Sequence, residues 1–404
     1  MTAIVGVLNK HAVALAADSA VTLGGGRKVL NSANKIFALS KYYPVAVAIY
    51  GNSEFIGTPW EIIIKEFRKK IGEESCPALI DYPDKFFKFL SENHYFCNEQ
   101  ESLQVLKDNV SLFYSYVLDR GENDGKKITD VLIDFEKQSP APFLTPFSKD
   151  DKLYLERSLN KELEDICNEL IRLGVQMERK RIINVLTSIL TNDLPPASSG
   201  LVFVGYGENE YFPVLCHYNV GYLINESLTL LPKPPIVINK QNPSAICPFA
   251  QTDVMRTILE GVSPKTQKIF RDSLTLTFKQ LTSQLANLIG NNGDVALADK
   301  IRNLDITPFH RIFTLSSSQA QTANYTRPFV QSVASLEKED LADFAESLIR
   351  LTSLKRKVSL DQETVGGPVD VMVISKGDGI IWMKRKHYFD AGMNHQFFSN
   401  YFNY

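Results

Sequence analysis

Four residues near the start of the chain have the types and the order that acyl-transfer chemistry needs: Thr2, Asp18, Lys35 and Gly51. A threonine hydroxyl is a poor nucleophile unless a base removes its proton. If Met1 is removed, the free α-amine of Thr2 can be that base, because its unperturbed pKa of about 7.7–8.0 leaves a neutral fraction at pH 7. Lys35 would lower neighbouring pKa values, Asp18 would hold Lys35, and the N–H of Gly51 would bind an oxyanion.

Each of these residues also has a simpler interpretation. Thr2 could be an ordinary strand residue, and Asp18 could be a turn residue that accepts backbone N–H groups. Lys28 competes with Lys35, but Lys35 opens the apolar run "IFAL" whereas Lys28 follows a glycine loop, so we favour Lys35. The loop "GGGRK" lacks the spacing of a phosphate-binding loop.

The first elements are predicted to be strands. Residues 2–8 and 12–17 are apolar at nearly every position, separated by a polar turn at residues 9–11. A sheet with one solvated face would alternate, so this sheet is expected to be covered on both faces. Apolar strands resume at 44–50 and, after the break "LPPASSG", at 201–207.

Helical periodicity dominates the stretches between these strands. Thr58 is a plausible N-cap, followed by Pro59 in the first turn. The expected core positions of the helices are Ile62, Phe67, Ile71, Leu159, Leu163, Ile166, Leu170 and Leu173. A later helix is predicted to begin near Phe249, and an amphipathic helix to span about 338–356.

The order of strands, helices, strands, helices and strands without βαβ repetition predicts an α+β fold. We expect a core from residues 1–60 and 195–390, a mainly helical insertion at 61–194, a second helical insertion at about 261–335, and an aromatic tail at 391–404. The insertions could roof a site, form an oligomer interface or enlarge the domain. The tail could dock on its own core or contact another subunit.

Composition excludes several classes of protein. A net charge of −2 gives no basic field for nucleic acid or anionic membrane. The longest apolar runs are too short to cross a bilayer, and the first residues lack the charge pattern of a secretory signal. Five scattered cysteines favour reduced thiols in the cytoplasm over a disulfide framework.

No metal or organic cofactor is expected. The six histidines show no ligand spacing. Cys216 and His217 are adjacent in a predicted strand, so they face opposite sides and cannot form a dyad.

The stretch "TAIVGVLNKHAVALAADSAVTLGGGRKVLNSANKIFAL", followed by "VAVAIYGNSEF", resembles the start of proteasome β-type subunits and of the related bacterial threonine peptidases. These are N-terminal-nucleophile (Ntn) hydrolases with a four-layer αββα sandwich. The resemblance implies that fold here, with extra inserted helices. By position it implies Thr2 as nucleophile, Asp18 as its acidic partner, Lys35 as the lysine and Gly51 as the oxyanion glycine.

Later segments extend the resemblance. "SGLVFVGYGENEYFPVLCHYNVGY" is similar to the family's central strand pair, and "GGPVDVMVISKGDGIIWM" to its closing strands. Before the Gly-Gly, Asp361 and Thr364 are near matches to the acid and the serine that hold the amine in that family. "CPFAQTD" at 247–253 stands where the family has Gly-Ser-Gly.

The resemblance implies a threonine hydrolase acting on a peptide or amide substrate through an acyl-enzyme. Two alternatives remain open: a proteasome-like scaffold or regulatory subunit without catalysis, and an amidase or acylase for a small molecule. The resemblance further implies a homo-oligomer, and leaves open an ATPase or regulatory partner.

Overall fold

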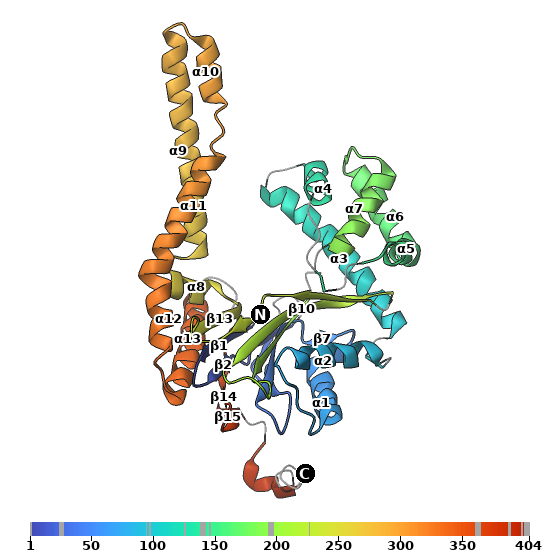
Figure 1. Cartoon of the computed structure of the whole chain (residues 1–404). Coiled ribbons are helices and arrows are strands. Elements are labelled where there is room, and N and C mark those ends of the chain that lie inside the picture. The colour runs from blue at the N-terminus through green and yellow to red at the C-terminus, as the bar shows by residue number, and fades with distance from the viewer. Residues whose placement is uncertain are drawn as a thin grey trace.

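Two antiparallel sheets lie face to face at the centre of the computed structural model (Figure 1). The structure describes residues 2–23, 28–93, 95–96, 98–124, 127–137, 143–144, 147–192, 198–225, 227–359, 365–386, 389–396 and 399. The fold is α+β with antiparallel sheets, which confirms the class predicted from the element order. The predicted domain boundaries stay a prediction.

The first sheet contains the start of the chain. Its strand order is β13-β1-β2-β14-β15, formed by Ser244–Ala250, Ala3–Asn9, Val13–Ala17, Asp370–Ser375 and Gly379–Lys384. Every residue of β1 and β2 is buried, so the sheet is covered on both faces, as their unbroken apolar runs predicted.

The second sheet has the order β11-β10-β9-β6-β5, and β12 also pairs with β10. These strands are Ser227–Pro232, Val214–Ile224, Ser199–Gly205, Val45–Gly51, Ile36–Ala38 and, for β12, Ile236–Val237. Two short ribbons complete the strands: β3 (Val21–Leu23) with β4 (Lys28–Leu30), and β7 (Glu54–Phe55) with β8 (Thr58–Pro59).

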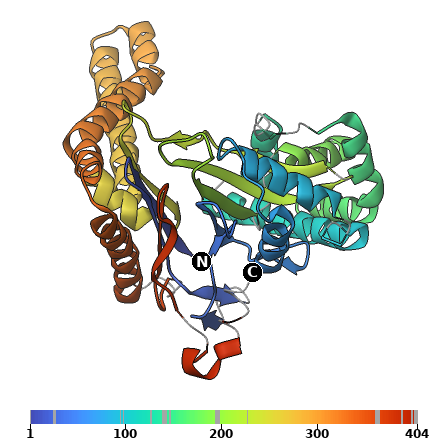
Figure 2. The ribbon, with the colours of Figure 1, turned by 60° about the horizontal axis from the view of Figure 1, so that its bottom comes forward.

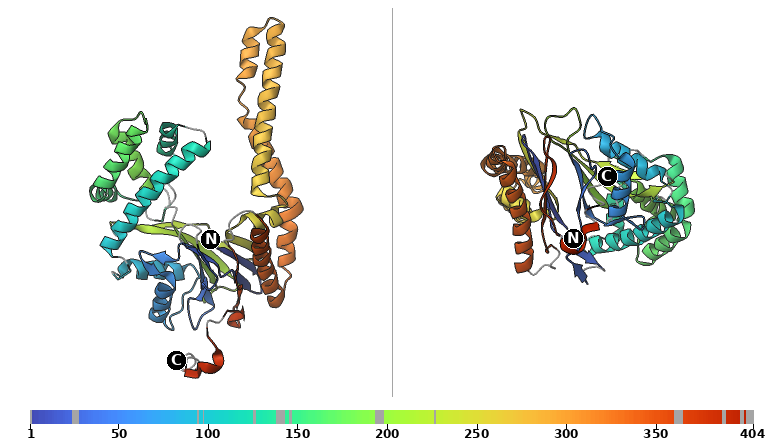
Figure 3. Two further views of the ribbon diagram at one scale, coloured as in Figure 1. Left: turned by 180° about the vertical axis from the view of Figure 1, so that it is seen from behind. Right: turned by 90° about the horizontal axis from the view of Figure 1, so that it is seen from below.

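Side chains from both sheets fill the space between them, including Ile4 and Leu15 from the first sheet and Ala48 and Val202 from the second. Helices cover the outer faces (Figures 2 and 3). On the first sheet these are α8 (Asp253–Glu260), α12 (Arg327–Val333) and α13 (Lys338–Val358). On the second sheet α1 (Trp60–Ile71) and α2 (Asp81–Glu92) bury an aromatic cluster.

Two helical projections leave this layered body (Figure 1). The helical lobe is formed by α3 (Glu99–Asp124), α4 (Ile128–Glu136), α5 (Lys149–Ser158), α6 (Asn160–Arg172) and α7 (Arg179–Asn192). The arm, residues 264–321, is formed by α9 (Pro264–Asn291), α10 (Val295–Arg302) and α11 (Thr307–Gln321). A π-helical segment, Thr322–Thr326, joins the arm to α12.

The start of α1 differs from the prediction. Pro59 is the N-cap and makes no side-chain cap bond. Thr58 therefore lies one residue before the cap position, where it pairs with Phe55 in the β7–β8 ribbon. Ile62 is exposed, since Ile63 and Ile64 take the core-facing positions of this helix.

Two further predictions about helices were wrong. The helix through Leu159 is interrupted there, where φ of −110° and ψ of 14° separate α5 from α6, and Leu173 is exposed because it lies beyond the end of α6. Phe249 begins no helix: it pairs with Ile4 in β13, where the ladder to β1 satisfies its backbone groups.

Among the described residues, no helix combines the length and the apolar character needed to cross a membrane.

Candidate functional site

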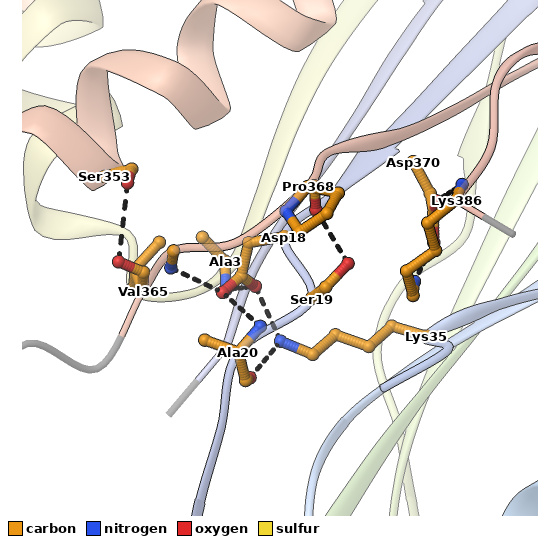
Figure 4. A network of polar contacts seen from close by, with 11 residues as sticks. Ala3, Asp18, Ser19, Ala20, Lys35, Ser353, Val365, Pro368, Asp370 and Lys386 are labelled. Atoms are coloured by element: carbon orange, nitrogen blue, oxygen red, sulfur yellow. Dashed lines mark hydrogen bonds and ion pairs between the residues drawn. The ribbon is translucent and has the colours of Figure 1, made fainter. Parts of the chain in front are cut away.

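Asp18 is the centre of a buried polar network at the end of β2 (Figure 4). Its side chain is 1% exposed. Oδ1 accepts the N–H of Ala3 at 2.8 Å and the ammonium of Lys35 at 2.6 Å. Oδ2 accepts the N–H groups of Ala20 at 3.2 Å and Gly366 at 3.1 Å. Four donors therefore converge on one carboxylate, two at each oxygen.

Lys35 lies directly before β5 and reaches across to Asp18 from the second sheet. Its Nζ also donates to the carbonyl of Ala20 at 2.6 Å. Burial lowers the pKa of Lys35 below its usual 10.5, because desolvation penalises the ammonium, and the charge of Asp18 partly opposes that shift. The lysine is thus a fixed donor with a reduced proton affinity.

Thr2 is joined to this network through its own peptide bond. The N–H that Oδ1 of Asp18 accepts is that of Ala3, the amide nitrogen bonded to the Thr2 carbonyl carbon. The Thr2 carbonyl accepts the N–H of Gln251 at 3.2 Å, which anchors the residue to the end of β13. Thr2 is buried. The structure therefore brings Thr2, Asp18 and Lys35 together.

Gly51 ends β6, the strand next to the one that Lys35 precedes. The carbonyl of Lys35 accepts the N–H of Ile49 at 2.9 Å. Lys35 therefore lies beside β6, next to the residue two positions before Gly51. Gly51 has φ of 80°, and a Cβ there would lie 2.4 Å from the carbonyl oxygen of Ser198. Only glycine suits this backbone. Its role as an oxyanion donor stays a prediction.

Asp361 and Thr364 lie outside the described residues. The segment directly after them is held against the site from several directions: Ser19 donates its N–H to the carbonyl of Gly366 at 3.2 Å and its hydroxyl to that of Pro368 at 2.7 Å. A cavity of about 210 Å³ adjoins Asp18 here, between this segment and α13.

Sequence reasoning missed a second buried ion pair beside Lys35. Asp370, at the start of β14, accepts both the backbone N–H and the side-chain ammonium of Lys386 (Figure 4). Asp370 pairs with Ala17 across the sheet, next to Asp18. The available signal was a charged residue at the start of the apolar strand "DVMVIS", the same pattern that identified Lys35.

A neutral polar group between the sheets was also missed. Tyr50 Oη lies 2.7 Å from Nε2 of His217 and donates to Oδ1 of Asn219 at 3.1 Å. Phe249 stacks on Tyr50 and meets His217 edge-on. Burial raises the pKa of Tyr50 to about 12 and lowers that of His217 to about 4, so both are neutral at pH 7. As predicted, Cys216 faces the opposite side of the strand, in the helix-covered core.

The buried His217 predicts a loss of stability in mild acid. Between pH about 6.5 and about 4 the unfolded histidine binds a proton that the folded one does not, so the free energy of unfolding falls as pH is lowered across this window. The total contribution is about 3 kcal/mol. Urea unfolding of the wild type and of His217→Gln at both pH values should show a flatter pH dependence in the variant. Parallel curves would contradict the assignment.

Within the described part of the chain, no three histidine, cysteine, aspartate or glutamate side chains are grouped to hold a metal ion.

Comparisons with known proteins identify structural neighbours only. No protein-family model matches the chain, and no curated protein matches it. Similar solved structures include the helical assembly of the Anbu complex from Pseudomonas aeruginosa, at 10% identity and a TM-score of 0.30, with 99% of this chain and 93% of that chain covered. Anbu (ancestral beta-subunit) from Yersinia bercovieri matches at 10% identity and a TM-score of 0.30, with coverages of 100% and 97%.

An Anbu (Gly-1) mutant from Hyphomicrobium sp. strain MC1 matches at 8% identity and a TM-score of 0.32, with coverages of 99% and 94%. The assignment drawn from the sequence, to the branch of proteasome β-type subunits and bacterial threonine peptidases, is wrong: the neighbours are Anbu proteins, which are proteasome-like but form a distinct family. At these TM-scores the likeness says nothing about the chemistry of Thr2.

Proposed function

We propose that this chain hydrolyses amide bonds, most simply in peptides, with Thr2 as the nucleophile after removal of the residue before it. One observation carries the proposal: the buried Asp18–Lys35 pair is hydrogen-bonded to the amide that follows Thr2. A buried ammonium–carboxylate pair costs desolvation energy and stabilises a fold only weakly. Strongly perturbed charged groups are, however, frequent at catalytic sites.

The reaction begins when the neutral α-amine of Thr2, directly or through a water, takes the hydroxyl proton. The oxygen forms a bond to the substrate carbonyl carbon, and the carbonyl π electrons move onto oxygen. The C–N bond then breaks, and the leaving amine takes the proton from the Thr2 ammonium. Water attacks the resulting ester, which releases the acid and restores the hydroxyl and the amine.

Lys35 acts electrostatically in this scheme. Its positive charge, held by Asp18 and the carbonyl of Ala20, favours the alkoxide form of Thr2 and disfavours a second positive charge on the α-amine. Both effects increase the fraction of the reactive state near neutral pH. Three of the four donors to Asp18 are backbone or side-chain groups of residues 3–35, and Lys35 among them comes from the second sheet, so the pair links the two sheets.

Gly51 is proposed to supply the N–H that stabilises the tetrahedral oxyanion. A preorganised donor of this kind contributes about 3–4 kcal/mol to transition-state stabilisation. The proposal includes a homo-oligomer. It also includes a cytoplasmic location, which is supported by the four described cysteines, all free and buried: Cys76, Cys167, Cys216 and Cys247.

A second candidate is a proteasome-like scaffold that does no chemistry. Three observations favour it. Among the described residues no hydrogen bond reaches the Thr2 hydroxyl, and "CPFAQTD" replaces the Gly-Ser-Gly expected beside the nucleophile. The chain also has two helical projections that leave the layered body of sheets and covering helices (Figure 1).

Mass spectrometry with an epoxyketone separates these candidates. An α′,β′-epoxyketone reacts with both the amine and the hydroxyl of an N-terminal threonine, so we expect a single adduct on the processed protein, located on Thr2 by peptide mapping. Thr2→Ala, processed in the same way, is the matched control and should remain unmodified. A processed wild type that forms no adduct, or a protein whose Met1 is retained, would favour the scaffold. Acyl substrates of peptide and non-peptide type would then distinguish a peptidase from a small-molecule amidase.

A further inference from the structure

The arm has little internal packing among its described residues. Its first helix, α9, has 28 residues, which corresponds to about 42 Å at 1.5 Å per residue. Only Thr282 and Ala286 of α9 are buried, Ala298 is the buried residue of α10, and α11 has none. Figures 1 and 3 show the arm projecting from the sheets, apart from the helical lobe. An isolated helical hairpin with so little buried surface gains little from its own packing.

One exposed face of α9 combines lysines with large apolar side chains. Lys265, Ile269, Leu276 and Lys279 follow one another at spacings of four, seven and three, which places them on a single face, and Lys268 flanks them. Ile269 is 52% exposed and Leu276 59% exposed. This set is called the lysine face.

The helical lobe carries a face of opposite charge on α3. Glu101, Asp108, Asp119 and Glu122 fall at spacings of seven, eleven and three, again on one side of the helix. Between them lie Leu112, 47% exposed, and Tyr116, 46% exposed. This set is called the carboxylate face.

The lysine face and the carboxylate face have similar arrangements of apolar side chains and opposite net charges. Each has exposed apolar side chains at its centre; the lysine face, which also contains Asp272, has a net positive charge, and the carboxylate face is negative. The arm as a whole contains seven lysines and arginines against four aspartates and no glutamate, whereas α3 contains six acidic and two basic residues. In the described part of the chain, no ion pair involves the three lysines or the four carboxylates of these faces.

We infer that the lysine face of one molecule docks on the carboxylate face of a second copy of this chain. A second copy is the favoured occupant because both complementary surfaces belong to the same sequence. Two arms would repel each other through their excess positive charge. Exposed apolar centres with a charged rim are typical of protein interfaces.

The contact is heterologous, since it joins two different surfaces. Each molecule therefore keeps a free lysine face and a free carboxylate face unless the assembly closes. Closed rings or open filaments follow, according to the rotation between neighbours. This inference is independent of the proposed chemistry at Thr2.

Charge exchange tests the contact. Lys265→Glu/Lys268→Glu/Lys279→Glu in one chain, and Glu101→Lys/Asp108→Lys/Asp119→Lys in another, should each raise the apparent Kd of self-association at least about tenfold, measured by mass photometry and sedimentation. All six positions are exposed on helices, so both proteins should fold, as checked by circular dichroism. A control with equal change in charge, Lys10→Glu/Lys233→Glu/Lys240→Glu, should assemble like the wild type.

Mixing the two variants gives the decisive result. In the second variant the carboxylate face has become positive, so it can bind the lysine face of the first variant, which has become negative. The unchanged lysine face of the second variant can bind the unchanged carboxylate face of the first. We expect equimolar mixing to restore association, and raising NaCl from about 50 mM to about 500 mM to weaken wild-type assembly through screening. The inference is overturned if the wild type is monomeric at all concentrations, if only the arm variant loses assembly, or if mixing restores nothing.

Discussion

Replacement of Thr2 by alanine is expected to lower kcat/KM for an amide substrate at least about 10³-fold. Alanine keeps the α-amine and the backbone bonds to Asp18 and Gln251 but has no oxygen to form the acyl-enzyme. The Thr2 hydroxyl has no described hydrogen-bond partner, so its removal should change the free energy of unfolding by only about 1 kcal/mol. Steady-state kinetics on the processed protein, with circular dichroism as the check on folding, measure both effects.

Thr2→Ser is the matched control because it keeps an Oγ nucleophile and loses only a methyl group. It should form the acyl-enzyme and retain activity. An alanine variant as active as the wild type would remove Thr2 from the chemistry, and the scaffold would become the better account of the chain.

The second large effect concerns the buried ion pair. Lys35→Met leaves the Asp18 carboxylate buried without its charged partner, which should cost about 3–5 kcal/mol of stability. Activity should also be lost, because no cation remains beside Thr2. The double variant Asp18→Asn/Lys35→Met leaves no buried charge at either position. Its loss of stability should therefore be smaller than the sum of the losses in the single variants Asp18→Asn and Lys35→Met. The double variant should remain inactive. Urea unfolding and kinetics on the three proteins test this.

Lys386→Met is the control for a buried pair that is not part of the proposed reaction. It removes the partner of Asp370 and should destabilise the protein to a similar extent. Each folded molecule should nevertheless keep most of its activity. Equal loss of activity in the Lys35 and Lys386 variants would mean that Lys35 acts only through stability.

Local sequence pattern was sufficient for several elements. The uninterrupted apolar runs of β1 and β2 indicated a sheet buried on both faces, because a solvated face would require alternation. The face of α13 with Leu341, Ala345 and Leu348 followed from helical spacing. Asp18 and Lys35 were singled out because acyl transfer at an N-terminal threonine needs a cation and a carboxylate that holds it, and both residues adjoin apolar strands.

Other features lay beyond local pattern. β13 contains Pro248 and only partly alternates, which is typical of an edge strand, so its pairing with β1 could not be read from its own residues. In α1 and α6, several neighbouring apolar residues could have faced the core. Which of them are buried depends on the residue at which each helix begins or ends.

The sequence by itself determined the α+β class, the buried central strands and the residues with chemistry to offer. Only the tertiary structure decided which of them meet: Gly366 donates to Asp18 across 348 positions of chain, and Asp370 brings Lys386 beside Lys35. Hydrophobic periodicity indicates which side of a helix or strand is buried, but not what covers that side. Contacts between distant segments depend on how whole sheets and helices pack, and no local pattern contains that information.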